Sequence, residues 1–524
     1  MNLRKVILYD TTLRDGAQTE GISLSVSDKL QITEKLDELG IPYIEGGWPA
    51  SNPKEMEFFR KAKRLKLKAA TLTAFGSTRK ANSPVGKDPQ VKSLLASGVR
   101  VVTIFGKSWD LHVRDVFRVP LEENLRMIAQ TIQFLKRHGV TVMYDAEHFF
   151  DGFRENPEYA LKTLEVAVDQ GAHTLILCDT NGGSIPSAVA KVVAQVGERL
   201  SIPLGIHCHN DTDLAVANSL AAVEAGVTQV QGTINGYGER CGNVNLCSII
   251  PVLQLKMGYR CVAPARLKTL TEVAHYVAEV CNMRPDDHQP FVGPSAFAHK
   301  GGVHINAVKK NPRTYEQIDP SAVGNRRRLL VSELGGKSTI LERAKELRLG
   351  LGRDPDEAKR FLKMVQELEA QGYHFEAAEG SFELLMRRAY KRFKRFFDLE
   401  GFRVMVEKDE KGTLTSEAAI KLKVDGVTEH SVAEGDGPVH ALDRAVRKAL
   451  AQFYPSLTQM HLVDFKVRVL EAKAGTAAKV RVLIESQDAQ DSWWTMGVSE
   501  NIIEASWQAL VDSIEYKLLK DRKA

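Results

Sequence analysis

Short apolar runs alternate with longer amphipathic stretches from the first residues of this 524-residue chain. The apolar runs are rich in β-branched residues, which is typical of buried strands. The stretches between them carry apolar residues at helical spacing; the first is predicted to begin at a Ser27 cap and to end at Gly40. The predicted strands are KVILYDTT (5–12), YIEGG (43–47), AATLTAF (69–75), VRVVTIF (99–105), VTVMYDAE (140–147), TLILCDT (174–180), PLGIHCHN (203–210) and QVQGTIN (229–235).

Eight such strand–helix units within about 260 residues are what a (β/α)8 TIM barrel requires. A doubly wound sheet is the competing α/β fold, but it seldom continues through eight units. We therefore predict a TIM barrel over residues 1–285. Residues 286–400 read as loops and then charged helices, which predicts helical linker subdomains. Residues 401–524 are β-rich again and predict a C-terminal α+β domain.

The C-terminal segment contains an internal pseudo-repeat. AAIKLKV (418–424) leads through a loop to GPVHALDRAVRKAL (437–450), and AAKVRVLI (477–484) leads to GVSENIIEASWQAL (497–510). Two similar strand–loop–helix units predict a pseudo-symmetric domain of sheet and helices. An ordinary α+β domain without true repetition is the alternative.

Charge and cysteine usage narrow the class of protein. The 71 Lys and Arg residues exceed the 66 Asp and Glu residues by only five, which mildly favours anionic small substrates. Because no basic cluster is interleaved with aromatic residues, we expect no nucleic-acid partner. The six cysteines form no CxxC pair, and neither a signal peptide nor a membrane-length apolar run is present. We expect a cytoplasmic protein with reduced thiols and no membrane association.

Polar residues gather at the carboxyl ends of the predicted strands, where the chemistry of a TIM barrel takes place. His207 and His209 follow one another at strand spacing, so both imidazoles lie on the same face. A single strand histidine is usually structural, but two at this spacing indicate a metal site. Asp15 and Asn243 are predicted to complete a nitrogen and oxygen ligand set. This set suits a divalent Mg, Mn, Zn or Co ion without choosing among them.

Several segments resemble the signature motifs of the acyl-CoA-condensing, metal-dependent TIM barrels. This family includes the 2-isopropylmalate, homocitrate and citramalate synthases, with hydroxymethylglutaryl-CoA lyase as a relative. The segments in and just after the barrel are DTTLRDGAQTEG (10–21), GIHCHND (205–211), GTINGYGERCGNVNL (232–246), AFAHKGGVHINA (296–307) and YEQIDP (315–320). IEGGWPASNPKE (44–55) and DAEHFFDGF (145–153) most resemble the citramalate-forming branch.

The resemblance implies a Claisen condensation of acetyl-CoA with a 2-oxo acid, followed by thioester hydrolysis, at a divalent cation. For the citramalate branch the 2-oxo acid is pyruvate. The resemblance further implies that residues 286–400 contribute to the active site and that residues 401–524 form a regulatory domain. It also implies a homodimer and feedback inhibition by isoleucine, the end product of the pathway.

The same resemblance assigns roles at the barrel mouth. Arg14 is expected to stabilise the developing alkoxide and, together with Gln18 and Thr180, to bind the substrate. Phe105 and Tyr144 are large residues at strand ends and are expected to narrow the pocket around a methyl group. Both aromatic residues can equally be core residues.

The proton acceptor is not singled out by the sequence. Glu147, at the end of the fifth strand, is one candidate, and His304 paired with Tyr315 is another. A surface position for His304 and a packing role for Tyr315 are the structural alternatives. His148 follows Glu147 where many members of the family carry aspartate, which changes the electrostatic environment of the proposed base.

Three rival functions remain at this point. The first is the same chemistry on another 2-oxo acid, giving 2-isopropylmalate or homocitrate. The second is a carbon–carbon lyase, which the additional C-terminal domain disfavours. The third is a non-catalytic amino-acid sensor, which would be expected to have lost part of the arginine and metal-ligand set that this chain retains.

Overall fold

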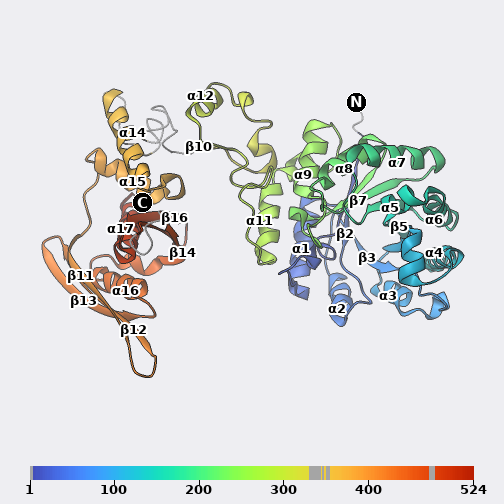
Figure 1. Cartoon of the computed structure of the whole chain (residues 1–524), viewed down its shortest axis with the longest axis horizontal. Helices are drawn as coiled ribbons and strands as arrows, with labels where there is room; N and C mark the ends of the chain where they lie inside the picture. Colours follow the sequence, from blue (N-terminus) through green and yellow to red (C-terminus); the bar gives the residue numbers. More distant parts are fainter. Residues whose placement is uncertain are drawn as a thin grey trace. The chain divides into compact units, whose positions relative to one another are not determined.

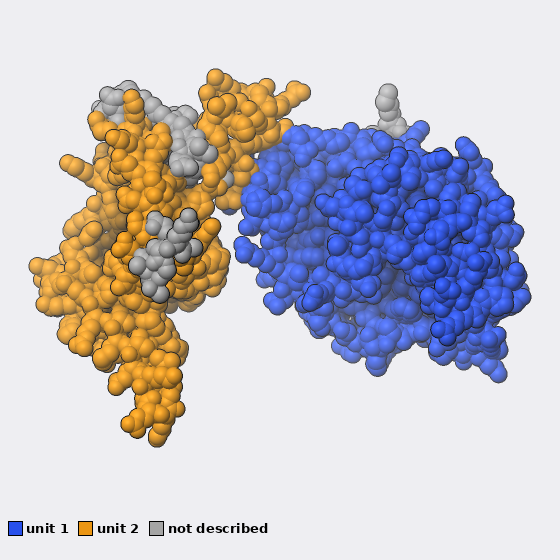
Figure 2. Space-filling model, viewed as in Figure 1, with its two compact units in different colours: residues 1–297, 317–327 blue, residues 298–316, 328–524 orange. Residues whose placement is uncertain are grey.

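The computed structural model describes residues 4–329, 344, 347, 349, 355–470 and 478–523. The chain divides into two compact units, Met1–Phe297 with Gln317–Arg327 and Ala298–Glu316 with Arg328–Ala524 (Figure 2). The predicted domain limits at residues 285 and 400 stay predictions. Among the described residues, no helix combines the length and apolar character needed to cross a bilayer.

The first unit is built on a closed barrel of eight parallel strands (Figure 1). Each predicted apolar run overlaps one strand, so the predicted TIM barrel is confirmed. β1 pairs with both β2 and β8, which closes the sheet. The strands are β1 (Ile7–Asp10), β2 (Tyr43–Glu45), β3 (Thr71–Ser77), β4 (Val101–Lys107), β5 (Thr141–Glu147), β6 (Thr174–Asp179), β7 (Leu204–Cys208) and β8 (Gln229–Gly232).

Amphipathic helices follow the strands and surround the barrel (Figure 1). They are α1 (Val26–Leu39), α2 (Pro53–Ala62), α3 (Pro89–Ser97), α4 (Leu121–Arg137), α5 (Phe149–Glu155), α6 (Pro157–Asp169), α7 (Pro186–Arg199), α8 (Ala215–Glu224), α9 (Leu246–Pro251), α10 (Pro264–Leu267) and α11 (Leu270–Val280). The start of α1 differs from the prediction. Ser25, not Ser27, caps the helix, because its side chain and that of Asp28 each accept the other residue's backbone N–H. Gly40 ends the helix in the left-handed conformation, as predicted.

The side chains of each barrel strand point alternately into two separate cores. Tyr9, Val101, Met143, Ile176 and Cys178 fill the inside of the barrel. The intervening strand residues pack outward against the helices in the main hydrophobic core. This division follows from the two-residue period of a strand.

The second unit begins with short elements and two longer helices. They are β9 (Ala298–His299), α12 (Gly302–Lys310), β10 (Arg328–Leu329), α14 (Pro355–Ala370) and α15 (Glu379–Ala389). Two successive modules follow, each with three antiparallel strands and a helix. The first contains β11 (Asp398–Lys408), β12 (Leu414–Val424), β13 (Val427–Gly435) and α16 (Pro438–Leu450), and the second contains β14 (His461–Val469), β15 (Val480–Gln487), β16 (Ser492–Ser499) and α17 (Ile502–Lys523).

The matching order of the two modules agrees with the predicted pseudo-repeat. The connection predicted as a loop is a strand instead, because β13 and β16 each pair with the strand before them. In the first module, alternate β12 residues such as Ile420 and Leu422 are buried in the same core as Leu442 and Val446 of α16. Residue 477, the first of the second echo, lies outside the described residues.

Candidate active site

Arg14 lies in the turn after β1 and is held by two carboxylates. Its Nε donates to Glu45 Oε1 at 2.6 Å, and its Nη1 lies 3.1 Å from Asp15 Oδ2. The guanidinium carbon lies 3.8 Å from the centre of the Phe75 ring. Burial opposes the charge, but Asp15 and Glu45 hold the pKa of Arg14 above its usual value. Arg14 therefore provides a fixed, permanent positive charge at the mouth of the barrel.

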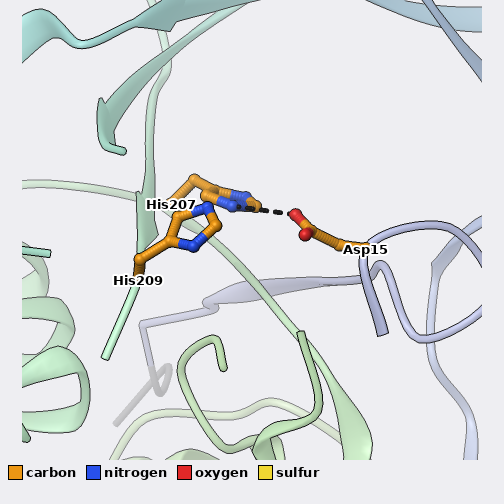
Figure 3. A group of neighbouring side chains, drawn as sticks. All are labelled: Asp15, His207 and His209. Atoms are coloured by element: carbon orange, nitrogen blue, oxygen red, sulfur yellow. Dashed lines mark ion pairs between the residues drawn. The ribbon is translucent and has the colours of Figure 1, made fainter. Parts of the chain in front are cut away.

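Asp15, His207 and His209 meet beside this arginine (Figure 3). One potential ligand atom from each residue lies within 4.8 Å of the others, and all three side chains are buried. His207 Nε2 lies 3.2 Å from Asp15 Oδ2. Among the described residues, Asp15 Oδ1 and His209 Nδ1 are buried without a hydrogen-bond partner. Leaving two such atoms unpaired is costly, and a bound cation would satisfy both.

The protonation of Asp15 and His209 also fits a divalent cation. Burial and the neighbouring His207 lower the pKa of His209 to about 3, so its imidazole is neutral and offers a lone pair. Burial favours the neutral acid of Asp15, but Arg14 and the two histidines hold the pKa of Asp15 below its usual range. A carboxylate and neutral imidazoles are the ligands that divalent transition metals accept. The structure therefore contains a possible metal-binding triad.

Asn243 lies next to this triad in the chain fold. Its backbone pairs with that of His209, and its side-chain Oδ1 is buried without a hydrogen-bond partner among the described residues. Two glycines allow this return of the loop. Gly242 has a φ of +90°, and a Cβ at Gly238 would lie 2.3 Å from Asn243 Nδ2. The loop after β8 thus folds back as the sequence predicted, while the role of Asn243 as a ligand stays a prediction.

Behind His207 lies a hydrogen-bonded row that the sequence reasoning missed. His207 Nδ1 is 2.9 Å from Gln231 Oε1, and Gln231 Nε2 donates to Asp145 Oδ1 at 3.2 Å. Burial, opposed in part by His207, raises the pKa of Asp145 to about 7. Asp145 could have been found from the sequence, because it lies two residues before Glu147 and points to the same side of β5.

Tyr9 forms a polar floor beneath Arg14. Its hydroxyl donates to Glu45 Oε2 at 2.7 Å and lies 2.8 Å from the Thr73 hydroxyl and 2.7 Å from the Thr103 hydroxyl. Tyr9 is fully buried. Four neighbouring strands are joined at this one oxygen, which fixes the position of Glu45 and, through it, that of Arg14.

Arg14 and the metal-binding triad line a cavity of about 180 Å³. Eight of the predicted site residues contribute to its walls: Arg14, Asp15, Gln18, Phe105, Glu147, Thr180, His207 and His209. The lining residues that were not predicted are Trp48, Phe75, Asp145, Cys178, Glu239 and Arg240. Trp48 meets Phe75 and Phe105 edge to face, and the two phenylalanine rings stack with centroids 5.4 Å apart. The cavity therefore combines an aromatic cluster with charged groups, and the Arg14 guanidinium lies against the Phe75 ring.

The prediction for Tyr144 is wrong. Tyr144 is fully buried in the core between the barrel and its helices, and it is not among the residues that line the cavity. Side chains alternate along β5, so if Glu147 faces the cavity, Asp145 faces it too and Tyr144 faces away. A Cβ at Gly106 on the adjacent strand would lie 2.8 Å from the Tyr144 hydroxyl, which confirms the outward direction.

The two candidate bases lie in different units. Glu147 borders the cavity and forms an ion pair with Lys107. His304 and Tyr315 belong to the second unit, where their rings stack with centroids 4.2 Å apart. His304 and Tyr315 are exposed to solvent. Their contribution to the cavity stays a prediction.

Comparison with known families gives three matches along the chain. Residues 5–277 match the HMGL-like family, residues 291–373 match the homocitrate synthase post-HMGL domain-like family, and residues 376–518 match the LeuA allosteric (dimerisation) domain. The first match covers the whole barrel with its metal-binding triad. The other two matches cover successive segments of the chain after the barrel.

Curated relatives are similar over nearly the full length. An (R)-citramalate synthase of Aquifex aeolicus is 55% identical, with 99% of each chain covered. An (R)-citramalate synthase of Geobacter sulfurreducens is 53% identical, with 99% of this chain and 98% of the relative covered. A 2-isopropylmalate synthase of Methanocaldococcus jannaschii is 32% identical, with 99% of this chain and 96% of the relative covered.

Proposed function

The chain belongs to the HMGL-like family, and we propose that it condenses acetyl-CoA with pyruvate to form (R)-citramalate in isoleucine biosynthesis. The acetyl methyl carbon forms a bond with the keto carbon of pyruvate. Water then cleaves the thioester and releases CoA, so that one acetyl-CoA, one pyruvate and one water give citramalate and CoA. The observation that carries the proposal is the buried Arg14 beside the Asp15, His207 and His209 triad, in a chain similar from end to end to citramalate-forming enzymes.

Asp15, His207, His209 and Asn243 are the residues that would hold a divalent cation, which we take to be Mg, Mn, Zn or Co. When bound, such an ion polarises the keto group of a 2-oxo acid. The unpaired buried atoms Asp15 Oδ1, His209 Nδ1 and Asn243 Oδ1 support this assignment, since each is a ligand atom without another partner among the described residues.

Arg14 is proposed to stabilise the negative charge that develops on the keto oxygen as the new bond forms. Its guanidinium is already fixed by Glu45 and Asp15, so little reorganisation is needed during the reaction. Thr180 Oγ1 accepts the backbone N–H of His148, which leaves the hydroxyl hydrogen to be donated to the substrate carboxylate. Gln18 lines the same cavity and is proposed to bind substrate.

Glu147 is proposed to remove the proton from the acetyl methyl group. It borders the cavity and forms an ion pair with Lys107. His304 and Tyr315 are proposed to take part in proton transfer on the basis of the family resemblance. The division of deprotonation and water activation among these three groups stays open to mutational analysis.

The aromatic cluster supports pyruvate as the 2-oxo acid. Trp48, Phe75 and Phe105 line one part of the cavity, and their packed rings limit the space beside the guanidinium of Arg14 for the side chain of the 2-oxo acid. Discrimination by size in an apolar pocket amounts to about 1–3 kcal/mol for each methylene. A larger 2-oxo acid, as in 2-isopropylmalate formation, is therefore disfavoured but has to be tested directly.

The C-terminal domain is proposed to regulate the enzyme and to join two subunits in a cytoplasmic homodimer. Edge strands of both βββα modules leave apolar side chains exposed, among them Met405 and Val406 on β11 and Val463 and Val467 on β14. A second subunit that covers such side chains would remove them from water. Isoleucine is the proposed effector. If deletion of residues 401–524 left isoleucine inhibition of an active enzyme intact, the regulatory role would be wrong.

The function is tested by measuring CoA release with acetyl-CoA and a panel of 2-oxo acids, before and after chelation. We expect the highest kcat/KM with pyruvate, citramalate as the product by mass spectrometry, and loss of activity in EDTA that a divalent metal restores. A preference for 2-oxoisovalerate or 2-oxoglutarate would refute the assignment of the substrate. Full activity after exhaustive chelation would refute the metal-dependent mechanism.

A further inference from the structure

His207 is connected to two buried polar residues that belong to other strands. Gln231 lies opposite it on β8, in direct register with His207 on β7. Asp145 comes from β5 and reaches Gln231 across the inside of the barrel. Asp145, His207 and Gln231 are all buried. Water therefore cannot replace a missing hydrogen-bond partner in this row without a cost in free energy.

With Asp145 ionised, the amide of Gln231 has one orientation that satisfies both neighbours. The carboxylate form only accepts hydrogen bonds, so the group that Gln231 turns toward it is the NH2, which lies 3.2 Å from Asp145 Oδ1. The amide oxygen then faces His207 Nδ1, at 2.9 Å, and can only accept. Nδ1 of His207 therefore carries a proton. Toward Asp15 Oδ2, 3.2 Å away, Nε2 acts as a donor, and toward a cation it offers its lone pair.

We propose that Asp145 and Gln231 are positioning residues that fix the tautomer and ring orientation of His207 for the cation. This inference rests on the metal centre of the proposed function and adds two residues to it. Asp145 sets the direction of the Gln231 amide, and Gln231 sets the position of the His207 proton. Hydrogen-bond partners behind a metal-ligating histidine typically contribute a factor of about 10–100 to metal affinity.

The test is calorimetric titration of the metal-free full-length protein with Mn²⁺ at pH 8, without substrates. Gln231→Met and Asp145→Leu remove one partner each at similar volume, and we expect both to weaken Mn²⁺ binding by about 10–100-fold. Asp145→Asn retains an oxygen that can accept from Gln231 Nε2, so this variant is expected to bind within about threefold of the wild type. Gln229→Met is the matched control, because Gln229 is also buried on β8 but its amide nitrogen faces Met143.

The outcomes separate this inference from the proposed function. If Gln231→Met and Asp145→Leu bind Mn²⁺ as the wild type does, positioning by these residues is refuted while the metal centre stands. If Asp145→Asn loses as much affinity as Asp145→Leu, the charge of Asp145 acts instead of its hydrogen bond, which also refutes the inference. If the wild type binds no Mn²⁺ and no other divalent ion tested, both the metal centre and the inference fail. Thermal unfolding in EDTA has to show that the variants are folded, and equal losses in Gln229→Met would mark a general packing effect and overturn the inference.

Discussion

Replacement of Arg14 by glutamine is expected to lower kcat for citramalate formation by about 100–1,000-fold. At an effective dielectric constant of about 20, a full charge roughly 4 Å from a developing oxyanion contributes about 4 kcal/mol. Loss of one preorganised oxyanion donor costs about 2.7–4 kcal/mol in measured cases, which is the same range. Since each 1.36 kcal/mol changes a rate about tenfold, the two estimates lead to the predicted factor.

The structure provides the reasons why glutamine cannot replace Arg14. Its position depends on Glu45 at 2.6 Å and Asp15 at 3.1 Å, and the ring of Phe75 covers one face of the guanidinium. Glutamine keeps a polar side chain but carries no charge. Because the interaction is formed mainly in the transition state, kcat and kcat/KM for pyruvate should fall by the same factor.

The assay follows CoA release at saturating acetyl-CoA over a range of pyruvate concentrations. Arg79→Gln is the matched control, because Arg79 is also largely buried and donates to Glu123 at 2.9 Å, but it does not line the cavity. It should lose stability while keeping kcat within about twofold. If folded Arg14→Gln protein retained kcat within about fivefold of the wild type, the proposed role of the guanidinium would be refuted.

Four further predictions concern metal, specificity, stability and pH. Chelated protein should melt at a lower temperature than Mn²⁺-loaded protein in calorimetry, since an ion at 100 times its Kd stabilises the folded state by about 2.7 kcal/mol; identical melting curves would contradict this. Phe105→Ala should raise the kcat/KM ratio of 2-oxobutanoate to pyruvate by about 10–200-fold, and an unchanged ratio would exclude Phe105 from the pocket. Lys29→Met should cost about 3–5 kcal/mol in urea unfolding, because the buried carboxylate of Glu55, 2.6 Å away, loses its counter-charge; the double variant with Glu55→Met should recover most of that loss. Burial favours the neutral acid of Asp488, but backbone N–H groups and Lys517 hold its pKa at about 2 against an ordinary 3.8. The carboxylate therefore stabilises the folded state above pH 3.8, and this contribution is lost as the pH falls toward 2. Asp488→Asn should flatten the fall of the free energy of unfolding over this pH range.

The barrel and its metal-binding triad follow from local sequence rules. Strand and helix periods are properties of short segments, and the carboxyl ends of barrel strands converge in every such fold. His207 and His209 share a face because they are two residues apart, and Asp15 ends the first strand unit. These inferences require no knowledge of how distant segments are aligned.

The inward and outward sides of β5 were also available from the sequence, but they were not used consistently. A strand that directs Glu147 inward must direct Asp145 inward and Tyr144 outward. Size at a strand end predicts a pocket role for Tyr144, whereas the two-residue strand period predicts its outward direction. The same rule would have added Asp145 to the predicted site.

Other parts of the site depend on long-range alignment that no local pattern encodes. Gln231 reaches His207 only because β7 and β8 pair in one register, and that register is set by the closure of the whole barrel. Trp48 lies beyond the end of β2 and meets Phe75 and Phe105 only once three strand ends are side by side. The strand β13 was missed for a different reason, since most of its residues are exposed and its composition resembles that of a loop.

The polar floor at Tyr9 closes the cavity at its inner end. Below it, Met143 and Ile176 fill the inside of the barrel, so nothing can pass through to the opposite end. Substrates and products must pass through the same opening of the cavity. The molecule that binds deeper in the cavity therefore has to bind first and leave last. Product-inhibition kinetics should therefore indicate an ordered mechanism, in which free CoA and the carboxylate product leave through the same opening.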